Sequence, residues 1–329
     1  MNSSDPHATH PRRSARILKR KAENEKIAVT PSKKARFYSS YRRQNFSLPD
    51  SIMFYIAKNP SSVNVYQKLI KSCKYFFVRN PIIVLSELCN DYEGWQTSIQ
   101  NVSSREGGRI MYPFVSIQNI DINNTCAKFW ITDGFKVDGS YVKNNRIMSS
   151  IIPKIYRCDA ERLYLSNQIV FLDELMFLGL NVGDDLNLDS VIVKNEDDTV
   201  VALEKLVELF PQASGITYKS PAGISTVTSK TFKALLEIPH FLTYYKFNLN
   251  EIPEDFDIEI FYVYMKKNKY TRVSLSFSDT LSEAYKDRLE AIIDEIIESK
   301  NHGYKVPLIT FHGLHDQKDK KIRNLFLTR

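Results

Sequence analysis

The residues best suited to chemistry are one histidine cluster and two pairs of aspartates. His312 and His315 stand three positions apart and could share a metal ion, but no Cys and no further His lies nearby in the sequence. Asp184-Asp185 and Asp197-Asp198 each join two carboxylates, the groups that acid–base catalysis needs. Glycine or polar residues flank each pair, so we expect acids in solvated turns and a polar loop around the histidines.

The sequence lacks the motifs of several common enzyme classes. No strand is followed by G-x-G-x-x-G, and G-x-x-x-x-G-K-[ST], G-x-S-x-G and H-E-x-x-H are absent. The four cysteines form no C-x-x-C pair, which is typical of reduced thiols in a nuclear or cytosolic protein: Cys73, Cys89, Cys126 and Cys158. We therefore predict no catalytic residue, no metal site and no cofactor.

The elements that would position any site lie in residues 81–329, where short strands alternate with amphipathic helices. In the strands, apolar residues recur at every second position, as in Leu163/Leu165 and Phe247/Leu249. After a first run at 81–85 and a polar loop at 91–108, the predicted strands are 129–132, 162–165, 190–193, 215–218, 246–249, 272–275 and 308–311. Helical periodicity predicts helices at 203–210, 232–236, 258–265 and 285–296, the last capped by Ser282.

The spacing of these strands predicts the fold class. Their starts, at 162, 190, 215, 245, 272 and 308, give a period mostly in the high twenties. This α/β pattern favours an irregular, leucine-rich-repeat-like solenoid with a parallel sheet, because one strand–helix unit cannot bury its own apolar face. A doubly wound α/β domain has the same alternation and is the alternative.

In a stacked array, one side of the sheet would be left open. The alternate positions on that side would be mostly small or polar, which suits a broad protein-binding surface. We predict that they are Tyr164, Ile192, Thr217, Asn248, Ser274 and Thr310.

The net charge of +7 on this 329-residue chain is concentrated in residues 1–43, which hold 12 Lys and Arg against 3 Asp and Glu. This tail is predicted to be disordered. Two basic clusters resemble a bipartite nuclear import signal that would bind an import carrier: Lys19, Arg20 and Lys21, then Lys33, Lys34 and Arg36. One alternative is a solvated basic tail, and another is non-specific contact with the phosphate backbone of a nucleic acid. Thr30 precedes a proline and fits a proline-directed kinase, whose phosphate would weaken carrier binding.

Residues 44–80 are predicted to form a helical module. Leu48-Pro49 opens a short helix with Ile52 and Ile56, and Asn59-Pro60 breaks it. After a cap at Ser61 or Ser62, one further helix carries an apolar stripe from Tyr66 to Phe77, and Asn80-Pro81 stops it. Helices this short cannot bury much apolar surface by themselves, so a partner must cover them.

The module resembles an F-box, more closely the divergent F-box-like modules of nematode multigene families. The resemblance implies docking onto a Skp-type adaptor of a cullin ubiquitin ligase. The residues carried over for that contact are Leu48, Pro49, Ile52, Ile56, Leu69 and Phe76. The family's Trp is absent, with Phe76-Phe77 in its place. The alternative is a helical cap on the next domain that docks nothing external.

These observations predict a non-catalytic substrate-receptor adaptor, in the nucleus, the cytoplasm or both, whose array binds a target protein. The long apolar run of a membrane span is missing, and so is an apolar signal sequence. Two alternatives stay open. One is an enzyme on a doubly wound α/β sheet, and the other is a nuclear scaffold whose basic tail contacts nucleic acid.

Overall fold

The computed structural model describes residues 32–100, 115–140, 144–224 and 226–328. The chain divides into two compact units, Met1–Arg79 and Asn80–Arg329. Each unit is described by itself.

The first unit is helical, with α2 (Lys33–Ser39), α3 (Asp50–Lys58), α4 (Val63–Ser72) and α5 (Lys74–Arg79). Pro49 directly precedes α3. Ser62 caps α4, as predicted, because its Oγ accepts a hydrogen bond from the Val65 amide at 3.3 Å. The apolar stripe predicted as one helix is divided between α4 and α5, since Cys73 has extended backbone angles, φ −154° and ψ 132°.

Part of the tail predicted to be disordered is a helix. The Phe37 ring on α2 lies 5.6 Å from the Phe77 ring on α5, in an edge-to-face arrangement. The Lys74 ammonium lies 4.7 Å from the centre of the Phe37 ring. These contacts hold residues 33–39 against the helical unit, a tertiary effect that the polar composition of the tail does not reveal.

The second unit is built on an eleven-stranded sheet within the described residues, and most of its strand pairs are parallel. Its strands are β1 (Ile82–Asp91), β2 (Gly94–Gln100), β3 (Val115–Asn119), β4 (Lys128–Asp138), β5 (Ile155–Cys158), β6 (Arg162–Ser166), β8 (Asp185–Asp189), β10 (Gly215–Lys219), β11 (Lys246–Ile252), β12 (Arg272–Phe277) and β13 (Leu308–Thr310). A second, two-stranded parallel sheet pairs β7 (Ile169–Phe171) with β9 (Ile192–Lys194).

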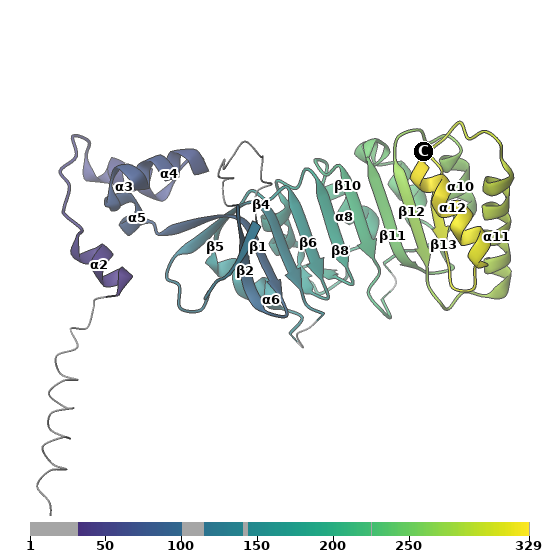
Figure 1. Ribbon diagram of the computed structural model, residues 1–329, viewed down its shortest axis with the longest axis horizontal. Helices are drawn as coiled ribbons and strands as arrows, with labels where there is room; N and C mark the ends of the chain where they lie inside the picture. The colour runs from purple at the N-terminus through teal and green to yellow at the C-terminus, as the bar shows by residue number, and fades with distance from the viewer. Residues whose placement is uncertain (1–31, 101–114, 141–143, 225, 329) are drawn as a thin grey trace, which may run out of the picture. The chain divides into compact units, whose positions relative to one another are not determined.

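The order of the strands follows the order of the chain. Along the main sheet it reads β13-β12-β11-β10-β8-β6-β4-β1-β2-β3, with β5 paired to β4 beside this path. From β1 through β4 to β13 every neighbouring pair is parallel, whereas β1, β2 and β3 pair antiparallel. Figure 1 shows the strands from β4 to β13 side by side in this order.

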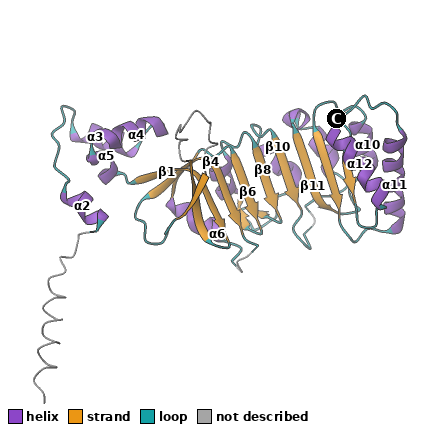
Figure 2. Cartoon of the chain, viewed as in Figure 1, coloured by secondary structure: helices purple, strands orange, loops and turns teal. Residues whose placement is uncertain are grey.

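Helices alternate with the strands of the second unit, and the last helix follows the last strand (Figure 2). They are α6 (Ile147–Ile151), α7 (Leu172–Gly179), α8 (Leu203–Leu209), α9 (Thr231–Leu236), α10 (Ile258–Met265), α11 (Glu283–Glu298) and α12 (Asp316–Thr328), with 3-10 turns η1 (Ile152–Lys154) and η2 (Pro239–Thr243). Ser282 caps α11 as predicted, its Oγ accepting from the Tyr285 amide at 3.3 Å. One hydrophobic core joins the buried strand residues to the buried faces of these helices.

The chain turns at a similar corner after successive strands. The Asn167 amide donates to the Asp189 carbonyl at 2.9 Å, and the Ser190 amide donates to the Lys219 carbonyl at 3.0 Å. The Ser220 amide continues the series, to the Asn250 carbonyl at 3.3 Å. Asn167 and Ser190 both turn with a positive φ, 51° and 56°. Each corner is therefore tied to the next through the backbone.

Two parts of the predicted strand pattern are wrong. The strand expected at 190–193 is in fact the corner after β8 together with β9, and the main-sheet strand is β8, which contains the predicted turn residue Asp185. The loop expected at 91–108 begins with the hairpin β1–β2, and residues beyond 100 lie outside the described ranges until 115. Strands β6, β8, β10, β11, β12 and β13 therefore start at 162, 185, 215, 246, 272 and 308, a less even spacing than predicted.

Candidate protein-binding surfaces

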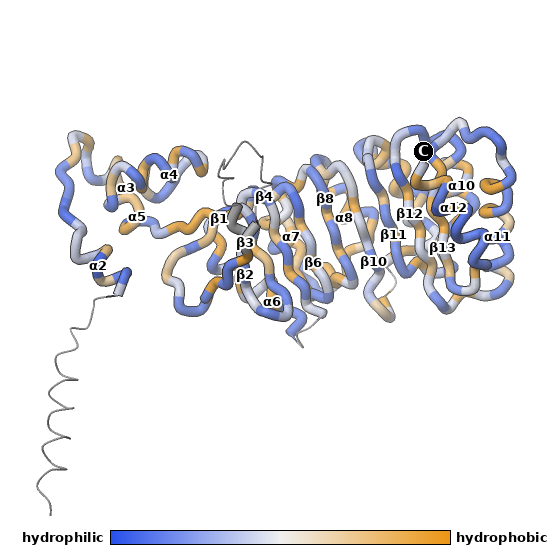
Figure 3. Tube along the Cα trace, in the orientation of Figure 1, coloured by the Kyte–Doolittle hydropathy of each residue, from blue (hydrophilic) through white to orange (hydrophobic). Residues whose placement is uncertain are grey.

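Five strands of the main sheet share one local pattern. Leu163 and Leu165 on β6 are buried, and their alternate neighbours turn to the other side of the sheet. The same register repeats in β8, β10, β11 and β12, and Figure 3 shows hydrophobic residues alternating with hydrophilic ones. We call the side opposite the core the polar face, and its described members include Glu87, Lys136, Asp138, Arg162, Tyr164, Ser166, Asp185, Asn187, Asp189, Thr217, Lys219, Lys246, Asn248, Asn250, Arg272, Ser274, Ser276, Leu308 and Thr310.

Acid–base pairs cross the polar face over glycines. Asp185 on β8 and Lys246 on β11 both align with Gly215 of β10, and the Lys246 Nζ lies 2.9 Å from the Asp185 Oδ2. The absence of a side chain at Gly215 lets these two residues meet across the intervening strand.

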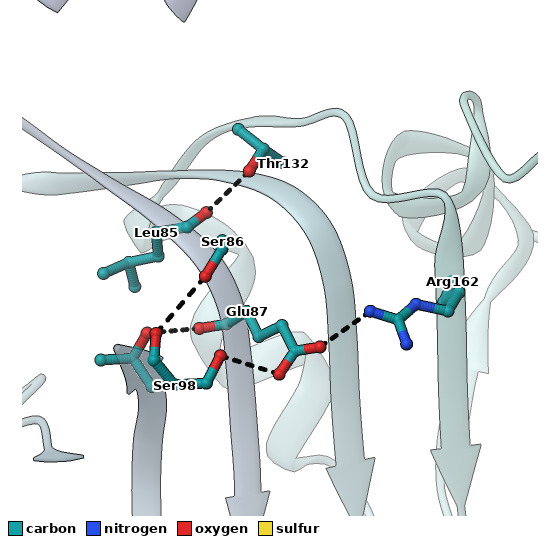
Figure 4. Close-up of polar contacts among 7 residues, drawn as sticks. Leu85, Ser86, Glu87, Ser98, Thr132 and Arg162 are labelled. Carbon is teal, nitrogen blue, oxygen red and sulfur yellow. Dashed lines mark hydrogen bonds and ion pairs between the residues drawn. The ribbon is translucent and has the colours of Figure 1, made fainter. Parts of the chain in front are cut away.

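The same arrangement occurs further along the polar face, where β1, β4 and β6 lie side by side. Glu87 and Arg162 both align with Gly134, and the Arg162 Nη2 lies 2.8 Å from the Glu87 Oε1. Ser98 on β2 also holds this carboxylate, donating from its Oγ to the Glu87 Oε2 at 2.8 Å (Figure 4). Glu87 thus fastens the antiparallel hairpin to the parallel strands.

The middle row of the polar face contains several of the predicted exposed positions. Tyr164, Thr217, Asn248 and Ser274 lie in one row, as predicted. The Asn248 Nδ2 donates to the Thr217 Oγ1 at 3.2 Å. Asn187 occupies the place expected for Ile192, which belongs to β9 in the small sheet, and Thr310 lies on the same side but one row further along its strand.

Arg272, at the start of β12, is held by the C-terminal helix. Its Nη2 donates to the Phe326 carbonyl at 3.4 Å, and its guanidinium carbon lies 4.5 Å from the centre of the Phe326 ring. Arg162, Asp185, Lys246 and Arg272 form a charged row beside the middle row. This charged row was not predicted from the sequence. Its signal is a charged residue directly before an alternating pair, as in Arg162-Leu-Tyr-Leu, Asp185-Leu-Asn-Leu, Lys246-Phe-Asn-Leu and Arg272-Val-Ser-Leu.

A hollow of about 550 Å³ lies at the carboxyl ends of β8, β10, β11 and β12. Its polar lining includes Ser190, Lys219, Ser220, Glu251 and Ser278. A catalytic nucleophile needs a base within hydrogen-bond reach. The bonds recorded for two of these serines lead elsewhere, from the Ser190 Oγ to the adjacent Asp189 and between Ser278 and Thr280. The hollow is therefore a surface recess with one cation and one anion.

The residues first considered for chemistry lie in ordinary surroundings. Asp197 accepts hydrogen bonds from the Thr199 hydroxyl and amide, which hold the pKa of its carboxyl below the usual value in a solvated turn, as predicted. His312 and His315 lie in the turn after β13. Among the described residues, no group of three or more His, Cys, Asp or Glu could hold a metal ion.

Two buried side chains in the core have pKa values raised well above neutral pH. Burial raises the pKa of the Cys158 thiol to about 11 and that of the Tyr218 phenol to about 12. Both groups therefore stay protonated at neutral pH.

Of the helices that the structure describes, none has both the length and the apolar character to cross a membrane.

The helical unit presents apolar side chains on its surface. Leu48, Ile52 and Tyr55 are 49%, 46% and 66% exposed. Ile52 and Tyr55 stand three residues apart on α3, so they lie on the same side of that helix. Met53 and Ala57 form the buried side of α3 and pack with Tyr75 and Phe76.

The predicted adaptor-contact residues therefore fall into two groups. Leu48, Pro49 and Ile52 are exposed, whereas Ile56 and Leu69 are half-buried against the interior of the unit. Phe76 is only 5% exposed, so it supports the helices from within and does not present a surface.

Of the two predicted import clusters, the second lies within the described residues. Lys33, Lys34 and Arg36 are exposed on α2, so this cluster is helical, whereas the tail was predicted to be disordered. Lys19, Arg20, Lys21 and Thr30 lie outside the described residues.

Comparison with protein-family models, curated proteins and solved structures gives no match for this chain. Any functional interpretation therefore depends on the surfaces described above.

Proposed function

We propose that this protein is a non-catalytic substrate receptor. Its helical unit would dock a Skp-type adaptor of a cullin ubiquitin ligase, and the polar face of its sheet would hold a target protein. The role would be to raise the effective concentration of the target near a ligase whose chemistry takes place elsewhere.

The exposed apolar side of α3 carries this proposal. Leu48, Ile52 and Tyr55 are exposed to about one half or more, although the unit has buried aromatic residues of its own. Grouped apolar side chains on one surface are typical of a protein-interaction site. Leu48-Pro49 ahead of a short helix is also the feature that resembles the F-box.

The second part of the proposal is that the sheet belongs to an irregular leucine-rich-repeat-like array. Two observations support it: the parallel strands follow chain order from β4 to β13, and successive corners are joined by backbone hydrogen bonds. A doubly wound sheet would reverse its strand order at the point where a ligand binds. Among the described strands, that reversal is missing between β4 and β13.

The polar face suits contact with a protein better than the capture of a small substrate. Its side chains spread over neighbouring strands and pair with one another across the surface, as Asp185 and Lys246 do. Small-molecule sites instead enclose their ligand in a largely apolar cavity with a few convergent polar groups.

We further propose that the basic tail directs import into the nucleus, so that the protein works in the nucleus, the cytoplasm or both. Lys33, Lys34 and Arg36 are exposed, as recognition by an import carrier requires. The helical form of this segment implies that α2 unwinds if the carrier binds an extended chain.

The adaptor contact can be tested with purified proteins. Leu48→Asp combined with Ile52→Asp should weaken capture of a Skp-type adaptor at least about tenfold, because two charges would be buried without partners. Val65→Asp is the matched control, since Val65 is an exposed apolar residue on α4, 39% accessible. Equal capture by all three proteins, with unchanged far-UV circular dichroism, would rule out this docking surface.

A further inference from the structure

The polar face is not uniform in charge. On β10, β11 and β12 the charged residues at the regular alternate positions are all cations, Lys219, Lys246 and Arg272. One acid, Glu251, is exposed at the irregular end of β11 and lines the same hollow as Lys219. The other side chains of these strands on the polar face are hydroxyls and amides, namely Thr217, Asn248, Asn250, Ser274 and Ser276. The other acids of the same face lie on β1, β4 and β8, namely Glu87, Asp138, Asp185 and Asp189.

Arg272 is held by an aromatic ring and a backbone carbonyl of the C-terminal helix. The Phe326 ring and carbonyl fix its guanidinium in place through contacts at 4.5 Å and 3.4 Å. A guanidinium has five N–H donors, and the Phe326 carbonyl uses one of them, which leaves donors for a two-pronged contact with a carboxylate. Because the side chain is already ordered, less conformational entropy is lost when a ligand binds.

Lys219 and Lys246 can exchange partners. The Lys219 Nζ lies 3.9 Å from the Asp189 Oδ1, and the Lys219 side chain is 39% exposed. Lys246 is closer to its partner, at 2.9 Å from Asp185, but its side chain is 33% exposed. Partly exposed pairs of this kind contribute little to stability, so an incoming carboxylate can replace the present partner.

We propose that strands β10, β11 and β12 bind an acidic, extended segment of the target protein. Arg272 is the anchor, Lys219 and Lys246 pair with further carboxylates, and the amides of Asn248 and Asn250 bond to the peptide backbone. This inference rests on the proposed target-binding role of the polar face and specifies the chemistry of the target.

Charge complementarity favours an acidic peptide over a nucleic acid. A nucleic acid carries a charge on every phosphate and would place some of them beside Asp185 and Asp189, which border the cations, whereas a peptide can place uncharged residues there. Single-stranded nucleic acids are usually held by aromatic side chains that stack on the bases. Among the described polar-face residues of β10, β11 and β12, aromatic side chains are absent.

The test uses the full chain with its import-cluster cations changed to Gln, which halves the number of Lys and Arg in residues 1–43 and so weakens binding of the probe to the tail. Lys19, Arg20, Lys21, Lys33, Lys34 and Arg36 are substituted for this purpose. The probe is a short fluorescein-labelled oligoglutamate, measured by fluorescence anisotropy at low and high salt. Oligolysine and oligothymidylate of similar length serve as comparison probes.

Arg272→Ala should weaken oligoglutamate binding at least about tenfold, since a charge-assisted contact is lost. Arg272→Lys should give a smaller loss, and Lys246→Gln a loss in the same direction. Lys205→Ala is the matched control, because Lys205 is an exposed cation on α8 that pairs with Glu208 at 2.8 Å. Its binding should equal that of the parent.

Three results would overturn the inference: equal binding by the Arg272→Ala and Lys205→Ala variants, oligolysine binding as strong as oligoglutamate binding, or a preference for oligothymidylate. Far-UV circular dichroism of each variant identifies a loss caused by unfolding, and Lys246→Gln then provides the comparison. The adaptor contact is tested separately through Leu48 and Ile52, so failure of that experiment and failure of this one are distinguishable.

Discussion

The glycine between Asp185 and Lys246 gives the sharpest test of the sheet geometry. A Cβ at Gly215 would lie 3.0 Å from the Lys246 Cβ and 3.1 Å from the Lys246 carbonyl oxygen. The carbonyl oxygen is part of the β11 backbone and the Cβ is bonded directly to it, so neither atom can turn away. Strands β10 and β11 would therefore have to move apart. We expect Gly215→Ala to reduce the free energy of unfolding of the second unit by about 1–3 kcal/mol.

Gly134 provides a matched control on the same side of the sheet. A Cβ there would lie 3.4 Å from the Glu87 Cγ, an ordinary contact with the side chain of a flexible residue. Gly134→Ala should therefore change the free energy of unfolding by at most about 0.5–1 kcal/mol, and it could stabilise the fold by restricting the unfolded chain.

A third variant separates the steric effect from the loss of the ion pair. Lys246→Ala keeps the Cβ that meets the new methyl group but removes the ammonium from Asp185. Because both side chains are about one-third exposed, this change should cost about 0–1 kcal/mol, less than Gly215→Ala. Urea unfolding followed by far-UV circular dichroism measures all three. Equal midpoints for Gly215→Ala and Gly134→Ala would refute the close approach of β10 and β11.

Further predictions concern individual residues. Cys126 is exposed, whereas burial raises the pKa of the Cys158 thiol to about 11. Iodoacetamide at pH near 8 should therefore alkylate Cys126 first and Cys158 only on unfolding, as mass spectrometry of the peptides would report. Early labelling of Cys158 would contradict its burial. Ser62→Ala should destabilise the helical unit by about 1 kcal/mol through loss of the α4 cap, whereas Ser61→Ala should not, as their thermal midpoints would show. Gln168 is 1% exposed and bonds the Met148 amide at 3.1 Å and the Asn167 carbonyl at 3.0 Å. Gln168→Leu should cost about 1–3 kcal/mol for each group left unpaired, measured by urea unfolding, and an unchanged midpoint would argue against these bonds.

Much of the sheet could be predicted because its alternation survives in the sequence. Leu163/Leu165, Phe247/Leu249 and Val273/Leu275 are buried as expected, since a strand covered on one side must alternate. Helix α10 (Ile258–Met265) also has its predicted bounds.

Strand β8 could not be identified from local preferences. Leu186 and Leu188 do alternate with polar residues, but those polar residues are Asp and Asn, which are rare in β-strands. The β-branched run at 190–193 is a stronger local signal for a strand. Pairing with both β6 and β10 decides the outcome, because it buries Leu186 and Leu188 completely. These neighbours are distant in sequence, and a local pattern carries no information about them.

The polar face was only partly foreseen for a similar reason. Alternation indicated Tyr164, Thr217, Asn248 and Ser274, but the pairing of Asp185 with Lys246 depends on two strand registers and on the glycine between them. In the helical unit, the apolar stripe continues with helical spacing through Cys73, so periodicity alone could not show the break there.

The receptor proposal is tested most directly by affinity capture of the intact protein from cells, read by mass spectrometry for Skp-type adaptor and cullin components. The proposal predicts that both accompany the wild-type protein and the Val65→Asp variant, and that both are lost when Leu48 and Ile52 are replaced by Asp. Recovery of neither component with the wild-type protein, or equal recovery with all three proteins, would contradict it.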